Sequence, residues 1–446
     1  MALSGLDIYK LLPKTNCKKC GFQTCLAFAM QLAKKAVSLD KCPSVGESVR
    51  LKLEEASLPA IRLVEIGTGE RRVAVGQETV LFRHEEKFHH PTAIGLIVED
   101  DLPVAELDRT LGQIRSLRFE RVGQQIGVEL VALRNTSART EVFVEQLRRI
   151  RAAVSLPLVL MACSAETLKA ALRLCASERP LVYCPKATDL EAFVTVCKES
   201  HVPLAFRASS LEEFSAATKK AAQAGFADLV LDIPENTTTE RLWQLTQIRR
   251  LSLKKGERSL GFPTMVVVNT AVESEAVCQA AAYIAKYASI LLVRTTKPEH
   301  ILPLLTLRQN IYTDPQKPLQ VEPNVYPVGA VSQDSPLLVT TNFSLTYYTV
   351  LGEIESSRRP CYLLCMDTEG MSVLTAWAAE KFGAEQIADT LTKFKLADTV
   401  RHKSIVIPGY VAMMSGDLED KSGWRVVVGP REASGLPVFL KNLAQG

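Results

Sequence analysis

The chain has 446 residues, of which 47% are apolar and 6% aromatic, a composition typical of globular proteins with two or three well-packed domains. Its net charge of +4 is spread over 53 basic and 49 acidic residues, too diffuse for a nucleic-acid footprint. No uncharged apolar run is long enough to cross a bilayer, and the opening MALSGLDIYKLLPK lacks the basic-then-apolar order of a signal peptide. We therefore expect a cytoplasmic protein that binds neither nucleic acid nor membrane.

Residues 1–58 are predicted to form a small helical domain: a short helix, a cysteine loop, a helix, a second cysteine loop and a further helix. One face of the helix that begins at Cys25 is apolar, with Leu26, Ala29, Met30 and Ala33. A domain of this size with so few large apolar side chains has a marginal core, so a bound metal cluster would supply much of the cross-linking.

The cysteines carry the most specific signal in the chain. Four of the eleven follow the spacing Cys17-x2-Cys20-x4-Cys25-x16-Cys42, and the other seven are scattered through apolar stretches. Four thiolates could also bind a zinc ion, but the usual zinc sites pair two Cys-x2-Cys units, and this segment has only one. The four-residue interval and the Cys42-Pro43 ending favour an iron–sulfur cluster, with zinc and unliganded thiols as the alternatives.

From near residue 90, apolar runs alternate regularly with amphipathic helical stretches. This alternation predicts eight parallel strands, at 94–98, 128–133, 158–162, 181–184, 204–206, 229–233, 265–268 and 290–293. Eight such units favour a closed (β/α)8 barrel over an open doubly wound sheet. Residues 65–90 are expected to form a β-hairpin that leads into the barrel.

Polar residues follow the predicted barrel strands, where a barrel normally places its chemistry. They are Asp100, Asn135, Lys186, Arg207, Asp232, Asn269 and Arg294. Asp232 and Asn269 invite comparison with methyltransferase barrels that bind a pterin ring through acidic and amide side chains, which leaves a pterin-dependent methyltransferase as one alternative function.

Residues 313–335 contain four prolines and little periodicity, as expected of a linker. Four further strands, at 337–341, 361–366, 405–407 and 426–428, alternate with helical stretches and predict a Rossmann-like α/β domain. The predicted domains are therefore 1–58, 59–325 and 326–446. Ligands of such sheets collect beyond the carboxyl ends of the strands, so the loops 340–346, 367–373, 409–413 and 429–436 form the candidate site.

The opening DIYKLLPKTNCKKCGFQTCLAFAMQLA, its closing Cys42-Pro43, the barrel and the small α/β domain together resemble the large subunit of the corrinoid iron–sulfur protein of acetyl-CoA synthesis. The resemblance covers essentially the whole chain. It implies that Cys17, Cys20, Cys25 and Cys42 hold a [4Fe–4S] cluster, and that the C-terminal domain binds a cobalamin-type corrinoid.

Many corrinoid carriers hold cobalt through a histidine in an Asp-x-His-x-x-Gly loop, and none of the six histidines here lies in that motif. Taken alone, this absence favours a flavin or a nucleotide, so an iron–sulfur flavoprotein is the second alternative function. The resemblance implies instead a base-off corrinoid without a protein histidine ligand.

A corrinoid is a large apolar disc rimmed by amides, so its site needs small residues, hydroxyls and free backbone groups. The candidate loops supply these, and we expect the cofactor-binding residues to be Thr340, Thr346, Gly370, Met371, Ser372, Val373, Gly409, Tyr410, Ala433, Ser434 and Gly435. Asn342 and Ser344 are as readily explained as helix caps.

The resemblance also implies the function. The corrinoid cobalt, as Co(I), accepts a methyl group from methyltetrahydrofolate held by a separate methyltransferase, and donates it to the nickel–iron–sulfur cluster of acetyl-CoA synthase/CO dehydrogenase. The [4Fe–4S] cluster, reduced by a donor such as ferredoxin, reactivates Co(II) to Co(I). No side chain is expected to act as a catalytic acid or base. The barrel is expected to pair with the small subunit of a heterodimer, and the 313–335 linker to let the corrinoid domain change position.

Overall fold

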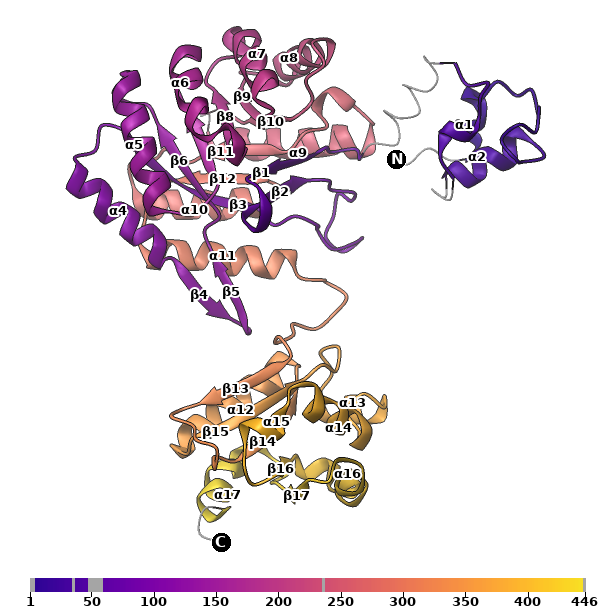
Figure 1. Cartoon of the computed structure of the whole chain (residues 1–446), viewed down its shortest axis with the longest axis vertical. Coiled ribbons are helices and arrows are strands. Elements are labelled where there is room, and N and C mark those ends of the chain that lie inside the picture. Colours follow the sequence, from indigo (N-terminus) through magenta and orange to yellow (C-terminus); the bar gives the residue numbers. More distant parts are fainter. Residues whose placement is uncertain (1–4, 34–36, 47–58, 235–236, 444–446) are drawn as a thin grey trace. The chain divides into compact units, whose positions relative to one another are not determined.

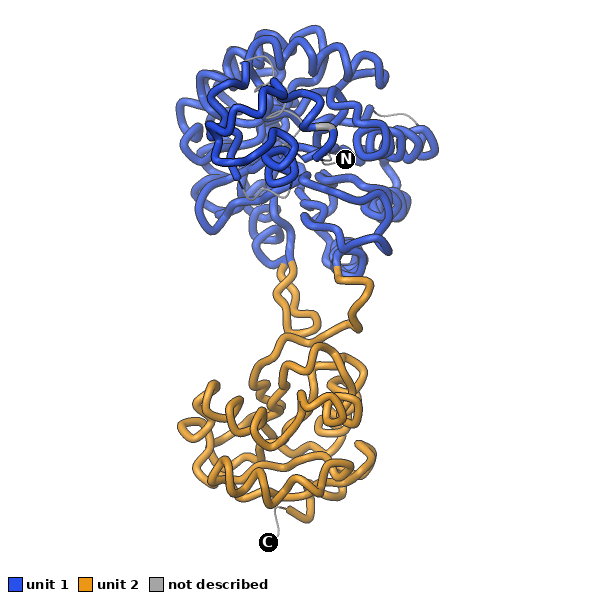
Figure 2. Tube along the Cα trace, turned by 90° about the vertical axis from the view of Figure 1, so that its right-hand side faces the viewer, with its two compact units in different colours: residues 1–117, 127–312 blue, residues 118–126, 313–446 orange. Residues whose placement is uncertain are grey.

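The computed structural model describes residues 5–33, 37–46, 59–234 and 237–443. The chain divides into two compact units, one of residues 1–117 and 127–312 and the other of residues 118–126 and 313–446 (Figures 1 and 2). None of the described helices is both long and apolar enough to span a membrane.

The N-terminal segment contains α1 (Gly5–Leu11), α2 (Cys25–Ala33) and the short 3-10 helix η1 (Leu39–Lys41). The two α-helices pack on each other through Ile8, Leu12 and Phe28. This core is as small as the sequence predicts. The further helix predicted before residue 58 lies outside the described residues.

The central segment is a closed barrel of eight parallel strands, and all eight predicted strands are confirmed (Figure 1). They are β3 (Ala93–Glu99), β6 (Leu130–Arg134), β7 (Leu158–Met161), β8 (Leu181–Cys184), β9 (Leu204–Arg207), β10 (Leu229–Asp232), β11 (Thr264–Val267) and β12 (Ile290–Val293). The covering helices are α4 (Val104–Ser116), α5 (Thr140–Ala153), α6 (Ala165–Cys175), α7 (Leu190–Ser200), α8 (Leu211–Gln223), α9 (Thr238–Lys254), α10 (Glu273–Ala285) and α11 (Pro298–Tyr312).

The predicted hairpin before the barrel is present and shorter than expected, with β1 (Leu63–Ile66) antiparallel to β2 (Val73–Gly76). Val64, Ile66 and Val75 share one hydrophobic cluster with residues near the beginnings of barrel strands, such as Ala93 and Leu130. The hairpin therefore closes the amino-terminal end of the barrel and leaves its carboxyl end, where barrels place their chemistry, to the βα loops.

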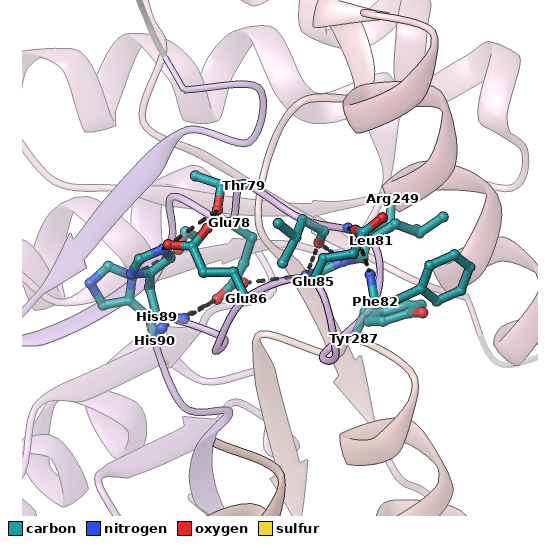
Figure 3. Close-up of polar contacts among 12 residues, drawn as sticks. Glu78, Thr79, Leu81, Phe82, Glu85, Glu86, His89, His90, Arg249 and Tyr287 are labelled. Carbon is teal, nitrogen blue, oxygen red and sulfur yellow. Dashed lines mark hydrogen bonds and ion pairs between the residues drawn. The ribbon is translucent and has the colours of Figure 1, made fainter. Parts of the chain in front are cut away.

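A buried ion pair between Glu78, in the segment after β2, and Arg249, in helix α9, joins these two parts of the barrel domain (Figure 3). Arg249 contacts Glu78 at 3.3 Å, and both side chains are at most 7% exposed. Arg249 also donates to the carbonyl of Val80 and lies between the rings of Phe88 and Tyr287, 4.6 and 4.5 Å from their centroids. Glu78 in turn accepts the backbone N–H groups of residues 89 and 90. Both charges are thus fully engaged, as burial requires.

The C-terminal domain is a five-stranded sheet in the order β13-β15-β14-β16-β17. The strands are β13 (Asn324–Val328), β14 (Leu337–Thr341), β15 (Cys361–Met366), β16 (Ser404–Ile407) and β17 (Arg425–Val428), and the last four confirm the predicted strands. One face is covered by α12 (Ser344–Ser357) and α17 (Leu436–Leu443). The other is covered by α13 (Val373–Ala378), α14 (Ala384–Lys393), α15 (Leu396–Thr399) and α16 (Ser415–Ser422).

Two parts of this domain differ from the sequence prediction. The boundary expected between residues 325 and 326 falls inside β13, which pairs antiparallel with β15, so half of the predicted 313–335 linker belongs to the sheet or packs on it. A hairpin of β4 (Arg118–Arg121) and β5 (Gln124–Gly127) also contributes its residues 118–126 to this unit, although it arises between barrel elements. Its turn residue Val122 is buried, donates to Tyr348 and accepts the N–H of Glu322.

Replacing Arg249 with Met should lower the free energy of unfolding of the barrel by about 3 kcal/mol, because it leaves the Glu78 carboxylate buried without its partner. Arg250→Met is the matched control, since Arg250 is the next residue of α9 and is exposed, and it should cost less than about 0.5 kcal/mol. Urea unfolding followed by circular dichroism measures both. Equal effects would show that the ion pair contributes nothing.

Candidate functional site

A cavity of about 330 Å³ opens at the carboxyl edge of the C-terminal sheet. Its floor is formed by the ends of β14 and β16, including Thr340 and Ile407, and one wall is the first half of α12. Strand β14 lies between β15 and β16. The connection from β14 to β15 crosses one face of the sheet through α12, and the connection from β15 to β16 crosses the other face through α13, α14 and α15. A crevice is expected at such a point in a parallel sheet, and the cavity occupies it.

Six of the eleven residues predicted to bind a cofactor line this cavity, and five do not. The lining residues are Thr340, Thr346, Ser372, Val373, Tyr410 and Ala433. The others, all on the same loops, are Gly370, Met371, Gly409, Ser434 and Gly435. The predicted loops therefore converge on one place, while part of each loop faces away from the cavity.

Three of the predicted positions are occupied by glycine, and at each of them a Cβ would clash with the protein backbone or with a neighbouring side chain. Gly370 has a φ of +74°, and a Cβ there would lie 2.9 Å from the side chain of Gln320. A Cβ on Gly409 would lie 2.5 Å from the carbonyl oxygen of Gly429, and one on Gly435 would lie 2.8 Å from Pro430. These glycines let the loops pack closely on each other, which shapes the cavity without lining it.

Thr340 supplies an unused hydrogen-bonding group in the cavity. Its side chain is 1% exposed, and its hydroxyl has no partner within the described residues. A buried hydroxyl without a partner costs free energy, so such a group usually awaits a ligand or an ordered water. Thr340 also lines the cavity, and its hydroxyl is therefore suited to bind a polar group of a bound cofactor.

The loop that follows β17 contributes the charged residues of the cavity lining. Tyr410 donates a short hydrogen bond to the Glu432 carboxylate, which raises the pKa of the Tyr410 phenol. This bond joins the two loops that follow β16 and β17. Arg431 adds a positive charge to the same wall.

Several lining residues were not predicted from the sequence. They include apolar residues from the strands and from α12, namely Leu338, Val339, Val350 and Val406, together with Thr349. Leu345 and Leu436, the first residue of α17, also line the cavity; both lie within the predicted loops but were not among the predicted contact residues. The pairs Leu345–Thr349 and Thr346–Val350 are each four residues apart on α12 and so share a face of the helix. That spacing was available in the sequence, but only the sheet position shows that the face meets a cavity.

The only histidine of the described C-terminal domain, His402, lies outside the cavity wall. Its Nε2 donates to the carbonyl of Ser335 at 3.0 Å, and its Nδ1 accepts the N–H of Ser404 at 3.1 Å. Both ring nitrogens therefore make hydrogen bonds to the backbone nearby, and His402 is not among the residues that line the cavity.

The four N-terminal cysteines lie in one small unit. Cys20, Cys25 and Cys42 contact the same hydrophobic cluster, and the backbone N–H of Cys25 donates to the Asn16 side chain at 2.8 Å. Hydrogen bonds to the Cys17 sulfur lower the pKa of this thiol and favour its thiolate, and the largest contribution comes from the backbone N–H of Lys19. Among the described residues, however, no three cysteine, histidine or acidic side chains come close enough together to bind a metal ion. The ligand assignment therefore stays a prediction from spacing and donor chemistry.

Several polar residues at the carboxyl end of the barrel make hydrogen bonds or ion pairs with one another. Asp100 accepts hydrogen bonds from Asn135, Thr136 and Ser137, and these bonds hold its pKa below the usual range despite burial. They tie the loop after β6 to the end of β3, which is a structural role.

Asp232 forms the second polar group of the barrel. It is fully buried, pairs with Arg207 at 2.7 Å and accepts from the Tyr183 hydroxyl at 2.8 Å. Burial nevertheless raises its pKa, and its Oδ1 has no partner within the described part of the chain. Tyr183 lies in β8, Arg207 is the last residue of β9 and Asp232 is the last residue of β10, so this group joins three neighbouring strands.

Comparison with known proteins decides the family. The family described as CO dehydrogenase/acetyl-CoA synthase delta subunit matches residues 63–440, and a family described as a putative Fe-S cluster matches residues 12–44. The chain is 46% identical over 445 residues to the corrinoid/iron-sulfur protein large subunit of Moorella thermoacetica, covering 100% of both. The chain belongs to the family of the corrinoid/iron-sulfur protein large subunit.

Other relatives bear the name of an acetyl-CoA decarbonylase/synthase complex subunit gamma. The chain is 38% identical to that of Methanothermobacter thermautotrophicus over 458 residues, with 100% of each covered. Among solved structures, dihydropteroate synthase from Thermus thermophilus matches with a TM-score of 0.41 and 15% identity, over 56% of this chain and 100% of that one.

Thr340→Val should leave the stability of the cofactor-free C-terminal domain unchanged or slightly higher, because it removes a buried hydroxyl that has no partner. The control Thr368→Val removes a buried hydroxyl that donates to Asn342 and should cost about 1 to 2 kcal/mol. Thermal unfolding of both variants measures the difference. A loss for Thr340→Val as large as that for Thr368→Val would mean that its hydroxyl is already satisfied in the free protein.

Proposed function

We propose that this chain is a methyl-group carrier that binds a corrinoid in its C-terminal domain and a [4Fe–4S] cluster at its N-terminus. The observation that carries the proposal is the 46% identity, over the full length of both chains, to a protein named for these two groups. The cavity at the carboxyl edge of the C-terminal sheet, with its unpartnered Thr340 hydroxyl, supports it independently.

The residues of the cavity fit a corrinoid. A bound corrinoid supplies a cobalt centre that accepts and releases a methyl group, and the cluster supplies single electrons that keep cobalt reduced. Thr340 and Thr346 offer hydroxyls to the amide rim, and the apolar wall of β14, β16 and α12 excludes water from the buried side. Because both ring nitrogens of His402 are engaged elsewhere, we propose that cobalt has no protein ligand. That the cofactor is also bound base-off is a proposal that rests on the family alone.

The partners follow from the same family. We propose a heterodimer with a small subunit, a methyltransferase that presents methyltetrahydrofolate as donor, and acetyl-CoA synthase/CO dehydrogenase as acceptor, with a ferredoxin-type donor reducing the cluster in the cytoplasm. Relatives named as a large subunit and as a subunit of the acetyl-CoA decarbonylase/synthase complex support an assembly of several chains.

Metal analysis and an absorbance spectrum of anaerobically isolated protein test this proposal. We expect about one cobalt and about four iron atoms per chain, with a base-off corrinoid band. Iron accompanied by a flavin spectrum and no cobalt would replace the carrier with an iron–sulfur flavoprotein. Binding of methyltetrahydrofolate by the isolated chain, abolished by Asp232→Asn, would favour a pterin-dependent methyltransferase.

Cys42→Ser should remove the iron while cobalt binding is kept, because the fourth thiolate closes the cluster site and the corrinoid lies in another domain. Cys163→Ser is the matched control: Cys163 is an exposed cysteine outside the N-terminal motif. Iron analysis and the electron paramagnetic resonance spectrum of the reduced protein measure the outcome. Full iron content in Cys42→Ser would remove this residue from the ligand set.

Thr340→Val should weaken binding of hydroxocobalamin to cofactor-free protein by about threefold to tenfold, which corresponds to the loss of one buried hydrogen bond. Thr349→Val is its control in the same cavity wall, because the Thr349 hydroxyl already donates to the carbonyl of Leu345 at 2.8 Å. Absorbance titration measures both affinities. Equal affinities in the two variants would mean that Thr340 contacts no polar group of the cofactor.

A further inference from the structure

Asn342, the residue after β14, has the most heavily used side chain near the cavity. It is 1% exposed, and its Oδ1 accepts three hydrogen bonds, two from Thr368 and one from the N–H of Gly370, all between 2.9 and 3.0 Å. Its Nδ2 donates to Gln320 and Asp367, each at 3.3 Å. A buried amide whose oxygen and nitrogen are both engaged in this way fixes the groups around it.

The groups that Asn342 joins belong to two different segments. The first is the loop from Asp367 to Gly370, which contains two consecutive residues with positive φ, Glu369 at +54° and Gly370 at +74°. This loop leads directly into Ser372, Val373 and Leu374 in the cavity wall. Its shape therefore decides where that wall stands.

The second segment is residues 318–321, the end of the chain's path from the last barrel helix into the C-terminal domain. The N–H of Val321 donates to the Asn342 carbonyl at 2.9 Å, and the carbonyl of Leu319 accepts the N–H of Ser344 at 3.1 Å. The side chain of Gln320 also packs against Gly370, where a Cβ would lie 2.9 Å away. None of these segment residues lines the cavity.

We propose that Asn342 is a positioning residue that couples this connecting segment to the cofactor loop, so that the placement of residues 318–321 and the affinity for the corrinoid are linked. The proposal rests on the proposed function in that it takes the corrinoid as the ligand of the cavity. Because linkage is reciprocal, binding of the cofactor also fixes the connecting segment, and a partner that displaces the segment weakens the cofactor site.

The first test is hydrogen–deuterium exchange of the full-length, cofactor-free protein with and without hydroxocobalamin. We expect slower exchange on binding in peptides covering 318–323, although that segment lies outside the cavity wall. The peptide around Ser357, at the other end of α12, should not change. Protection confined to the cavity loops would overturn the coupling.

The second test uses Gln320→Met, which keeps the packing on Gly370 and removes the oxygen that accepts from Asn342. We expect the affinity for hydroxocobalamin to fall about threefold to tenfold and the cofactor-dependent protection of 318–323 to disappear. Asn342→Ala should have the larger effect, since it also releases the N–H groups of Thr368 and Gly370.

Ser357→Ala is the matched control for lost stability. Ser357 is buried in the same domain, and its hydroxyl donates to the Ile354 carbonyl and accepts the N–H of Arg359, so its removal destabilises the domain far from the cavity. Its affinity for hydroxocobalamin should equal that of the wild type. Wild-type affinity in Gln320→Met, or an equal loss in Ser357→Ala, would reduce the network to an ordinary structural contact.

The outcomes also separate this proposal from the proposed function. If wild-type protein binds no corrinoid, the carrier function fails, and the coupling is then judged by exchange in the free protein. There Gln320→Met should speed exchange of residues 367–372 by about threefold or more. An unchanged rate in that loop overturns the coupling whether or not a corrinoid binds.

Discussion

The site depends on the position of β14 between β15 and β16. All three strands run parallel, so their carboxyl ends meet at one edge of the sheet, and the connections from β14 and β15 leave on opposite faces. The alternation of side chains along β14 then directs Val339 into the core under α13 and α14, while Leu338 packs under α12. Thr340 continues that second series at the strand end, which explains how this buried threonine comes to line the cavity.

The sequence predicted the elements whose signal is local. The barrel strands and β14, β15 and β16 are largely buried on both faces and read as apolar runs, which is how they were found. Strand β17 is an exposed edge strand and was found from its three consecutive valines. Strand β13 was missed because it is an antiparallel edge strand containing Pro327, with only Val328 fully buried. The β4–β5 hairpin was missed because its strands are short and polar, and because its turn residue Val122 makes hydrogen bonds with residues more than 190 positions away.

The site was predicted less completely than the fold, for a physical reason. Sequence identifies loops and small residues, but it does not tell a glycine that makes room for a ligand from one that makes room for a neighbouring side chain or backbone segment of the protein. Gly370, Gly409 and Gly435 proved to be of the second kind. Asn342 was equally explained as a helix cap, whereas its partners Gln320 and Thr368 come from segments that only the fold brings together.

The C-terminal unit is attached to the barrel by more than one chain segment. The chain passes between the two units after residues 117, 126 and 312, and the hairpin and the entering segment meet within the C-terminal unit, where Val122 and Val321 share one hydrophobic cluster. The linker expected over 313–335 is therefore shortened to the residues before Pro318, because Gln320 and Val321 are bonded to Asn342 and residues 324–328 pair with β15. Any change in the position of this domain must come from bending at those few residues and at both ends of the hairpin together, and this requirement restricts its motion more than a single proline-rich tether would.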